Sequence, residues 1–439
     1  MKHREEHQTV AAARGGPLAG RRMLFVAPDD YPAYRVDLTE LFSRHLVNRG
    51  LSIDWSLHRV DVGPAAIDDR GAERFILPAH KKGGILAKIR NRISNGAQRW
   101  GLVRKVARGE YDLVQVRDYI YWGLPFLIAA RIARKPFVYW MSFPVLEMRW
   151  ELAVRPYVPI SLLGRAANFA HALLGKLVFY RFLGYADHVV VQSRRMRERL
   201  EEQGVARDLM TPVEMGVSTE RFNREAVEAS RDPRIAGRPV LIYVCSSLFG
   251  RLFDTAVGAL AAARRRGHDA VLVAVGPLAE HERDALPQTL ERHGIPQDAF
   301  ISTGMLPLKE LLSYVKAADV CLSPVEMTRA HEVASPTKLV EYLAMGRPVV
   351  ASVHYDQNDV VGSSGAGLIA AMNGEAMGEA AARLLADREW AEEMGAKGPA
   401  WVKANRDYAR LADRVERLYA GVLERQSTSA IEAASQPAE

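Results

Sequence analysis

The sequence predicts an α/β protein with two domains, each built on a parallel sheet covered by helices. Short apolar runs alternate with helical patterns along most of the chain, which is typical of parallel α/β folds. The chain has 439 residues, of which 48% are hydrophobic and 25% charged, so it is long enough for two domains of ordinary size. The turn-rich stretch PVEMGVSTERFN (212–223) separates two sets of apolar runs. We therefore expect one sheet before this stretch and one after it.

Each expected strand is a short run of apolar and β-branched residues. The first set comprises residues 23–28, 51–58, 111–116, 135–141 and 188–193. The second set comprises residues 238–245, 270–276, 299–303, 319–324, 348–352 and 367–371. An amphipathic helix is expected over residues 36–50, where Gly50 ends it. The expected divisions of the chain are a flexible arm (1–20), a first domain (21–213), a second domain (214–404), a C-terminal helix (405–426) and a disordered tail (427–439).

Composition restricts the cellular setting. The two cysteines, Cys245 and Cys321, both lie in apolar strand-like runs, which favours buried free thiols in a reducing compartment. The first twenty residues have no apolar core of the kind found in a signal peptide. No run approaches the ~20 apolar residues that span a bilayer. We therefore expect a cytoplasmic protein.

The best-defined stretch of the chain is SPTKLVEYLAMGRPVVAS (335–352). Ser335 and Pro336 are typical of a helix start, with the serine as N-cap. Gly346 ends the helix, and an apolar strand follows it. Lys338 and Glu341 lie three residues apart near the start of this helix. Free amide groups at that end favour phosphate binding, although the pair is also consistent with an ordinary exposed salt bridge.

This stretch resembles the nucleotide-sugar signature of the retaining glycosyltransferases of family 4, also called group 1, which have the GT-B fold. The resemblance extends over most of the chain from Arg22 to Leu423. It implies two Rossmann-like domains that face each other across a cleft, with the last helix returning to the first domain. It also implies that the loop amides, including those of Thr337, hold the donor phosphate and that Glu341 binds the ribose hydroxyls. The predicted donor is a nucleotide sugar, and the predicted acceptor is a glycan or a lipid-linked molecule used in cell-envelope or exopolysaccharide biosynthesis.

Other parts of the family pattern are altered in this sequence. In the loop CSSLFGRLFD, which begins at Cys245 and includes Ser246, Arg251 is the only cation, and it is the candidate for stabilising the leaving diphosphate. Lys338 is the candidate second cation. The resemblance also implies that Gly304 and Met305 pack against the nucleobase, where glycine permits a close backbone approach.

Two acidic residues are candidates for catalysis. The family carries an acid eight residues before the position of Glu341, but here that residue is Val333 and the nearest acid is Glu332. Either Glu332 reaches the donor sugar or this acid is absent. Asp118 follows the predicted strand YDLVQV, at the end where open sheets bind ligands. It is expected either to orient the acceptor hydroxyl or to stabilise an oxocarbenium-like centre, and the alternative is a structural role such as capping the helix that follows.

Two segments combine apolar and basic residues. No acid occurs between Glu73 and Glu110, and the segment 81–108 has isoleucines and a tryptophan near helical spacing with cations around them. Residues 160–185 are also apolar and basic. Such helices bind the surface of anionic membranes, so peripheral contact with the inner face of the plasma membrane is one interpretation. The other is that the apolar stripe packs on the sheet and the cations are solvated.

Several other functions fit the sequence less well. The alternatives are a non-catalytic GT-B partner protein and a nucleotide-sugar epimerase of the same fold. The basic segment lacks a recognisable nucleic-acid-binding module, so no nucleic acid is expected as a partner. The chain has no G-x-G-x-x-G motif, which argues against a dinucleotide-dependent dehydrogenase, and no G-x-x-x-x-G-K motif, which argues against a P-loop enzyme. No Asp-x-Asp pair follows a predicted strand, so we expect that no metal or other cofactor is required.

Overall fold

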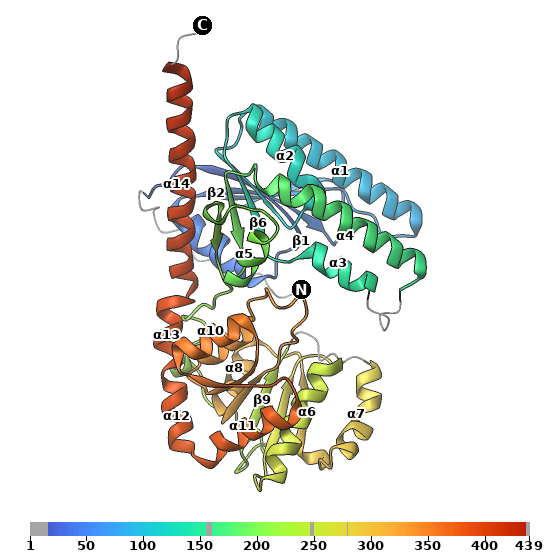
Figure 1. Cartoon of the computed structure of the whole chain (residues 1–439), viewed down its shortest axis with the longest axis vertical. Helices are drawn as coiled ribbons and strands as arrows, with labels where there is room; N and C mark the ends of the chain where they lie inside the picture. Colours follow the sequence, from blue (N-terminus) through green and yellow to red (C-terminus); the bar gives the residue numbers. More distant parts are fainter. Residues whose placement is uncertain (1–15, 155–159, 246–249, 279, 436–439) are drawn as a thin grey trace. The chain divides into compact units, whose positions relative to one another are not determined.

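The computed structural model describes residues 16–154, 160–245, 250–278 and 280–435. The chain forms two compact units. Unit 1 comprises the chain up to Val213 together with the residues from Leu411 onward, and unit 2 comprises Glu214–Arg410. Each unit contains one largely parallel sheet with helices packed around it (Figure 1). This confirms the predicted α/β class with two parallel-sheet domains.

The sheet of unit 1 has eight strands in the order β3-β4-β2-β1-β5-β6-β7-β8, all parallel except β3. Its strands are β1 (Arg22–Tyr31), β2 (Ser52–Arg59), β3 (Ala66–Asp69), β4 (Glu73–Leu77), β5 (Leu113–Arg117), β6 (Phe137–Met141), β7 (His188–Val191) and β8 (Met210–Pro212). Its helices are η1 (Asp37–Leu46), η2 (Val47–Arg49), α1 (Ile85–Ala107), α2 (Ile120–Ile132), α3 (Val145–Val154), α4 (Leu162–Leu183), α5 (Arg194–Glu201) and η3 (Arg207–Leu209).

The sheet of unit 2 has six parallel strands in the order β11-β10-β9-β12-β13-β14. Its strands are β9 (Val240–Val244), β10 (Val271–Val275), β11 (Phe300–Gly304), β12 (Val320–Ser323), β13 (Val349–Ser352) and β14 (Gly367–Ala370). Its helices are η4 (Arg224–Ala226), α6 (Gly250–Arg265), α7 (Glu280–Arg292), η5 (Gln297–Ala299), α8 (Leu308–Ala317), α9 (Thr337–Ala344), α10 (Tyr355–Ser364), α11 (Gly374–Ala386), α12 (Arg388–Ala396), α13 (Gly398–Asn405) and the start of α14 (Tyr408–Ser435).

All eleven predicted strands are present, but three further strands of unit 1 were not predicted. β3 has mostly exposed side chains, and β8 is only three residues long. Neither carries the apolar pattern by which a strand is recognised. β4 is short and is held by parallel pairing with β2. The predicted helix over residues 36–50 consists of a π-helical segment, η1, followed by a 3₁₀ turn, η2, and Gly50 ends it in the left-handed region as predicted.

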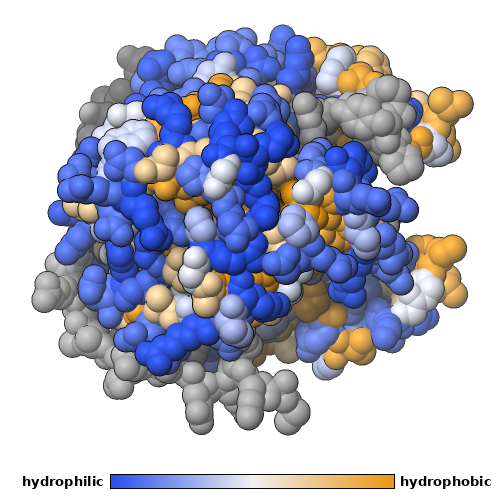
Figure 2. Space-filling model, turned by 90° about the horizontal axis from the view of Figure 1, so that it is seen from below, coloured by the Kyte–Doolittle hydropathy of each residue, from blue (hydrophilic) through white to orange (hydrophobic). Residues whose placement is uncertain are grey.

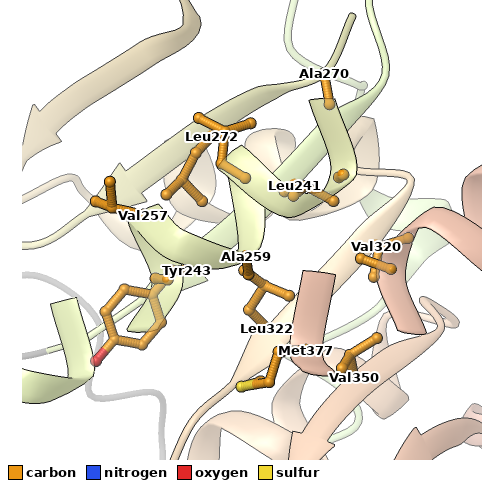
Figure 3. Packing of buried hydrophobic residues seen from close by; sticks show 14 of the residues in the cluster. Leu241, Tyr243, Val257, Ala259, Ala270, Leu272, Val320, Leu322, Val350 and Met377 are labelled. Atoms are coloured by element: carbon orange, nitrogen blue, oxygen red, sulfur yellow. The ribbon is translucent and has the colours of Figure 1, made fainter. Parts of the chain in front are cut away.

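Aromatic side chains fill much of the core of unit 1, where the ring of Phe25 stacks on Trp55 with 4.8 Å between centroids. The core of unit 2 is mainly aliphatic. Leu241, Leu272 and Leu322 point into it from three strands, and the hydroxyl of Tyr243 points away from these leucines (Figure 3). On the face of the molecule shown in Figure 2, hydrophilic residues predominate and hydrophobic ones occur in smaller groups. No disulfide joins the two cysteines, both of which the structure describes; Cys321 is buried as predicted, whereas Cys245 is only partly buried.

Helix α14 packs on unit 1 from Leu411 onward. Arg414 donates a hydrogen bond to the carbonyl oxygen of Pro212 at 3.0 Å, and Arg49 forms ion pairs with Asp413 and Glu416, both at 2.6 Å. The helix continues to Ser435, so the prediction of a disordered tail beginning at residue 427 was wrong over most of its length.

Candidate functional site

The candidate site in unit 2 lies at the carboxyl ends of β9 and β12. These two strands are neighbours at the centre of the sheet, and the chain proceeds outward from them in opposite directions. In open parallel sheets this arrangement leaves a crevice at the carboxyl ends of the strands, and ligands bind there. Helix α9 follows β12, so its N-terminus lies at this end. The tertiary structure thus places the stretch 335–352 where its fold class binds ligands.

The N-terminus of α9 differs from the prediction in one respect. Pro336 is the N-cap, and no side chain caps the first amides. The hydroxyl of Ser335 instead donates to Asp356 at 2.9 Å and accepts from the amide of Met215 at 3.1 Å and from Arg406 at 3.0 Å. The prediction that Ser335 caps the helix was therefore wrong. The amides of the first turn, from Thr337 onward, have no intrahelical acceptor and remain available to an anion.

Lys338 lies in the first turn of α9 and is half-buried. Its ammonium nitrogen is 4.5 Å from the centre of the Tyr243 ring in β9, which is a cation–π contact. Burial lowers the pKa of Lys338 to about 8. Lys338 and Glu341 are both in the described chain, and no ion pair joins them, so the interpretation as an ordinary salt bridge does not hold.

Glu341 is half-buried one turn further along α9. Burial raises the pKa of its carboxyl group to about 7, and Lys338 opposes this effect. Within the part of the chain that the structure describes, its carboxylate makes no hydrogen bond or ion pair. A half-buried carboxylate without an internal partner is free to accept hydrogen bonds from a ligand. Helix α9 therefore presents an ammonium group and a carboxylate, neither of which forms an ion pair with a described residue.

The ends of three neighbouring strands form the floor beside α9. Cys245 follows β9, Gly276 follows β10, and Gly304 ends β11. The amide of Gly276 donates to the carbonyl oxygen of Gly304 at 3.0 Å. A Cβ atom at Gly276 would lie 2.2 Å from the carbonyl oxygen of Cys245, and its φ of +142° also requires glycine. Met305, next to Gly304, is 71% exposed, and its contact with a nucleobase stays a prediction.

Two predicted residues in the β9–α6 connection are only partly described. Ser246 lies outside the described residues. Arg251 lies in the first turn of α6, but its side chain is also outside them. Their predicted roles in binding the diphosphate therefore stay predictions.

Glu332 lies in the loop between β12 and α9 and is half-buried. Its amide donates to the carbonyl oxygen of Thr328 at 2.7 Å, and Thr328 also contacts the Nδ1 atom of His331 at 2.8 Å. These contacts give the loop a compact turn three residues before Ser335. In the described ranges, no group of three or more His, Cys, Asp or Glu residues is placed to hold a metal ion.

Asp118 lies in unit 1, at the carboxyl end of β5, and has a left-handed φ of +51°. Its carboxylate accepts hydrogen bonds from the amides of Ser142 at 2.8 Å and Phe143 at 3.2 Å and from the Ser142 hydroxyl. It also lies 3.6 Å from the buried guanidinium of Arg117, which pairs with Asp37 at 2.7 Å. These contacts hold the start of the loop after β6, and the contact of Asp118 with an acceptor stays a prediction.

Sequence reasoning missed two features of the site. The first is Tyr243, whose ring supports Lys338. The second is the buried pair between Arg406 and Asp356, at 2.5 Å, which both bind the Ser335 hydroxyl. The partners of each contact are far apart in the sequence, so no local spacing indicates them. The sequence predicts the buried strand that carries Tyr243. It also shows that charged residues occur in apolar surroundings, but it does not show which residues they contact.

Two family models and a curated relative match the chain. The family model described as "Glycosyl transferases group 1" matches residues 238–387, and the one described as "Glycosyltransferase Family 4" matches residues 39–221. A GDP-mannose-dependent α-(1-6)-phosphatidylinositol monomannoside mannosyltransferase of Mycobacterium tuberculosis is 27% identical over 279 residues, covering 62% of this chain and 71% of that protein.

Solved structures share the fold at low sequence identity. Sucrose-phosphate synthase from Thermosynechococcus elongatus has a TM-score of 0.66 at 18% identity and covers 93% of this chain and 100% of its own. α,α-Trehalose 6-phosphate synthase from Burkholderia multivorans has a TM-score of 0.64 at 13% identity, with 95% and 99% covered. HepE from Anabaena, solved with UDP-glucose, has a TM-score of 0.60 at 14% identity, with 91% and 100% covered. This chain is therefore a glycosyltransferase of the GT-B type.

Proposed function

We propose that the chain transfers a hexosyl group from a nucleoside-diphosphate sugar bound at the N-terminus of α9. The observation that carries this proposal is the pair of half-buried, oppositely charged groups on α9, Lys338 and Glu341, which form no ion pair with each other or with any other described residue. The diphosphate would bind the free backbone N–H groups of Thr337 and Lys338 at the helix start, next to Pro336, together with the Lys338 ammonium. The Glu341 carboxylate would accept hydrogen bonds from the two ribose hydroxyls. The HepE complex with UDP-glucose, a protein of the same fold, is consistent with such a donor.

Four other predicted residues and Glu332 would make the remaining contacts with the donor. The nucleobase would pack on Gly304 and Met305, where exposed apolar surface adjoins the strand ends. Arg251, in the first turn of α6, would supply the second cation for the diphosphate, and Ser246 would contribute to the same loop. Glu332 would approach the donor sugar. We further propose that these groups stabilise the leaving diphosphate without a divalent metal ion.

In the proposed reaction, the bond between the anomeric carbon and the diphosphate breaks, and a bond forms between that carbon and an acceptor hydroxyl oxygen. The electron pair of the broken bond leaves with the nucleoside diphosphate. The hydroxyl proton is released to the diphosphate product or to solvent, so atoms and charge balance. Retention of the anomeric configuration is proposed from the resemblance to family 4. The Lys338 ammonium and the helix amides favour the transition state because negative charge grows on the diphosphate there.

The acceptor is proposed to be a glycan or a lipid-linked molecule used in cell-envelope or exopolysaccharide assembly. The mycobacterial relative, named for a phosphatidylinositol monomannoside acceptor, supports this setting. The described chain has no helix long and apolar enough to cross a membrane. Peripheral contact with the inner face of the plasma membrane would need an exposed surface that is both apolar and basic.

Helices α1, α2 and α4 provide such a surface, and they lie on one side of unit 1 (Figure 1). We call their exposed apolar residues the apolar face: Ile85, Leu86, Ile89, Ile93, Trp100, Tyr121, Leu124, Ile128, Ile132, Leu162, Leu163, Phe169, Leu173, Leu174, Leu177 and Val178. Neither α1 nor α4 contains an acid, and both carry lysines and arginines. Apolar side chains bordered by cations fit the interface of an anionic membrane. The interpretation that the apolar stripe is fully packed on the sheet does not hold for these residues.

The experiment that tests the donor site is ligand-induced thermal stabilisation with UDP-, GDP-, dTDP- and ADP-sugars, followed by release of the nucleoside diphosphate. Ligand at about 100 times its dissociation constant adds roughly 2.7 kcal/mol of stability. We expect stabilisation by one nucleotide class, lost in Glu341→Ala and kept in Glu310→Ala, a control at an exposed glutamate of α8. Equal stabilisation of both variants would place the donor elsewhere, and no stabilisation by any donor would contradict the proposal.

A further inference from the structure

A second site in unit 1 begins with the buried guanidinium of Arg99 in α1. Arg99 is 7% exposed, and its guanidinium carbon lies 4.4 Å from the centre of the Tyr119 ring and 5.5 Å from that of Trp122. It donates one hydrogen bond, to the hydroxyl of Tyr119. Its Nε atom is buried and has no hydrogen-bond partner in the described parts of the chain.

Arg99 also has no carboxylate partner among the described residues. The nearby acids at the end of β1 do not supply one: Asp29 lies 3.6 Å from Arg35 and 3.9 Å from Arg117, and Asp30 forms no ion pair with Arg99. The buried Arg117, in contrast, pairs with Asp37 at 2.7 Å. A buried charge without a counter-ion is costly. An anionic ligand that binds at Arg99 would supply the missing counter-ion and would explain why the buried charge is present.

Tyr119 and His58 form the rest of this site beside Arg99. The Tyr119 hydroxyl accepts from Arg99 and lies 2.5 Å from the Nε2 atom of His58 at the end of β2. In the Nδ1–H tautomer of the neutral imidazole, the Tyr119 hydroxyl donates to Nε2. Burial, followed by the charge of Arg99, lowers the pKa of His58 and so favours this neutral form. In that tautomer, neither the Nδ1–H group of His58 nor the Nε–H group of Arg99 has an acceptor among the described residues.

The same residues connect this edge of the sheet to the apolar face. Trp100, which is 52% exposed on that face, contacts Trp122 with 5.7 Å between ring centroids. Trp122 contacts Arg99, and Arg99 contacts Tyr119, which follows β5 at the carboxyl end of the sheet. In open sheets that end binds substrates. A molecule with an apolar part on the face and an anionic group at Arg99 would therefore reach the substrate-binding edge of unit 1.

We propose that Arg99, with His58, binds the phosphate of a phosphorylated lipid acceptor whose apolar chains lie against the apolar face. This rests on the proposed function and narrows its acceptor to the lipid-linked class. Arginine forms paired, charge-assisted hydrogen bonds with phosphate oxygens. Arg99 is thus an acceptor-binding residue, distinct from the exposed cations of α1, which attract anionic membranes through their charge alone.

The test measures binding of the full chain to vesicles of phosphatidylcholine with and without phosphatidylinositol, and to inorganic phosphate in solution, by tryptophan fluorescence. Trp122 lies beside Arg99, so it should report occupancy, and Trp122→Phe identifies its share of the signal. Arg99→Met is compared with Arg92→Met, an exposed arginine of the same helix. We expect phosphatidylinositol-dependent binding to weaken roughly tenfold to a hundredfold in Arg99→Met, the effect of one lost hydrogen bond to a charged group. Arg92→Met should weaken it far less.

Equal weakening by the two substitutions would overturn the proposal, because diffuse charge would then explain binding. Binding of inorganic phosphate through Arg99 with no preference for phosphatidylinositol would overturn the lipid assignment. If Arg99→Met does not fold, His58→Gln and Arg99→Lys take its place and are expected to weaken the same binding. Donor stabilisation through Glu341 is measured on every variant. Loss of phosphate binding with donor stabilisation intact separates this inference from the proposed function, which fails only if donor stabilisation is absent in the unmodified chain.

Discussion

The ammonium group of Lys338 lies 4.5 Å from the centre of the Tyr243 ring, and no ion pair joins it to Glu341 in the next turn of α9. An aromatic face orients an ammonium group without occupying its N–H donors, whereas a carboxylate would occupy them. The contact therefore holds the lysine in place while leaving it able to bind an anion. It also connects the helix that follows β12 to the strand at the centre of the sheet.

The first prediction concerns this contact. Replacing Tyr243 with leucine removes the ring and should weaken nucleoside-diphosphate binding roughly twofold to thirtyfold, the effect of losing about 0.5–2 kcal/mol of cation–π interaction. Tyr243→Phe keeps the ring and should bind nearly as tightly as the unmodified chain. Isothermal titration calorimetry measures both constants. Equal weakening in the two variants would show that the hydroxyl, not the ring, is needed.

The second prediction is a pH dependence of donor binding. The pKa of Glu341 is raised to about 7 and that of Lys338 is lowered to about 8. Below the first value the carboxyl group is protonated and loses an acceptor, and above the second the lysine loses its charge. Donor affinity should therefore be highest between about pH 7 and 8 and fall on both sides. Bound diphosphate itself favours the charged lysine, so the complex should retain it to higher pH than the free protein.

Glu341→Gln provides the control for this profile, because the amide does not titrate. We expect weaker binding at pH 8 and no loss of affinity as the pH falls from 8 to 6. The same variant tests linkage to folding. Since the native state holds the Glu341 proton more tightly than the unfolded chain does, this group lowers the free energy of unfolding as pH rises from 4.5 to about 7. If the donor affinity of Glu341→Gln still falls as the pH decreases from 8 to 6, a group other than Glu341 causes that fall.

The third prediction is that transfer does not depend on a divalent metal ion. Helix amides and lysine or arginine side chains are proposed to neutralise the diphosphate, so sugar transfer should be unchanged by an excess of EDTA. Release of nucleoside diphosphate, followed with and without EDTA and added Mg²⁺, measures this. Lys338→Met should lower the turnover number in either condition, because charge stabilisation in the transition state is lost. Loss of activity in EDTA that Mg²⁺ restores would contradict the prediction.

The fourth prediction concerns the buried ion pair of unit 2. Arg406 and Asp356 are both less than one tenth exposed and lie 2.5 Å apart. Asp356→Ala leaves Arg406 buried without its partner, and we expect the free energy of unfolding to fall by about 3–5 kcal/mol. The control is Arg388→Ala, which breaks an ion pair to Asp319 at the same 2.5 Å, but Arg388 is 72% exposed. That change should cost only about 0–1 kcal/mol.

Urea unfolding of the two variants gives the comparison. The double variant Asp356→Ala/Arg406→Ala should lose less stability than the sum of the single changes, because neither buried charge remains. Additive losses would mean that the two residues do not act as a pair.

The fifth prediction tests membrane contact. Leu177, 58% exposed on α4, should be critical for binding to anionic vesicles, and Leu177→Glu should reduce co-sedimentation with them. The matched control is Ile67→Glu, which introduces the same charge at a residue 60% exposed in β3. Donor stabilisation should be unchanged in both variants. Equal vesicle binding by Leu177→Glu and the unmodified protein would exclude α4 from the contact.

The local features of α9 illustrate how far the sequence alone was sufficient. Gly346 ends the helix with a φ of +64°, as predicted, because a short-range backbone requirement decides the residue there. Ser335, by contrast, has the composition of an N-cap, but its hydroxyl bonds to Asp356 and Arg406. A hydroxyl can satisfy its hydrogen bonds locally or at a distance, and the sequence near Ser335 does not distinguish the two.

Asp118 shows the same limit in unit 1. Its place after a buried strand correctly predicted that it lies at the carboxyl end of the sheet. Its carboxylate binds the amides of Ser142 and Phe143, which belong to the next strand connection. Whether a carboxylate at a strand end faces a ligand or a neighbouring loop depends on how that loop is folded.

The sequence by itself determined the α/β class, the eleven principal strands and the helix that carries Lys338 and Glu341, because alternation of apolar runs, helix punctuation and glycine turns act over a few residues. Only the tertiary structure decided that Lys338 rests on Tyr243, that Ser335 belongs to a buried network, and that Arg99 has no counter-ion among the residues that the structure describes. These features depend on which distant side chains share a low-dielectric interior, where each buried charge must find a partner or remain available for a ligand.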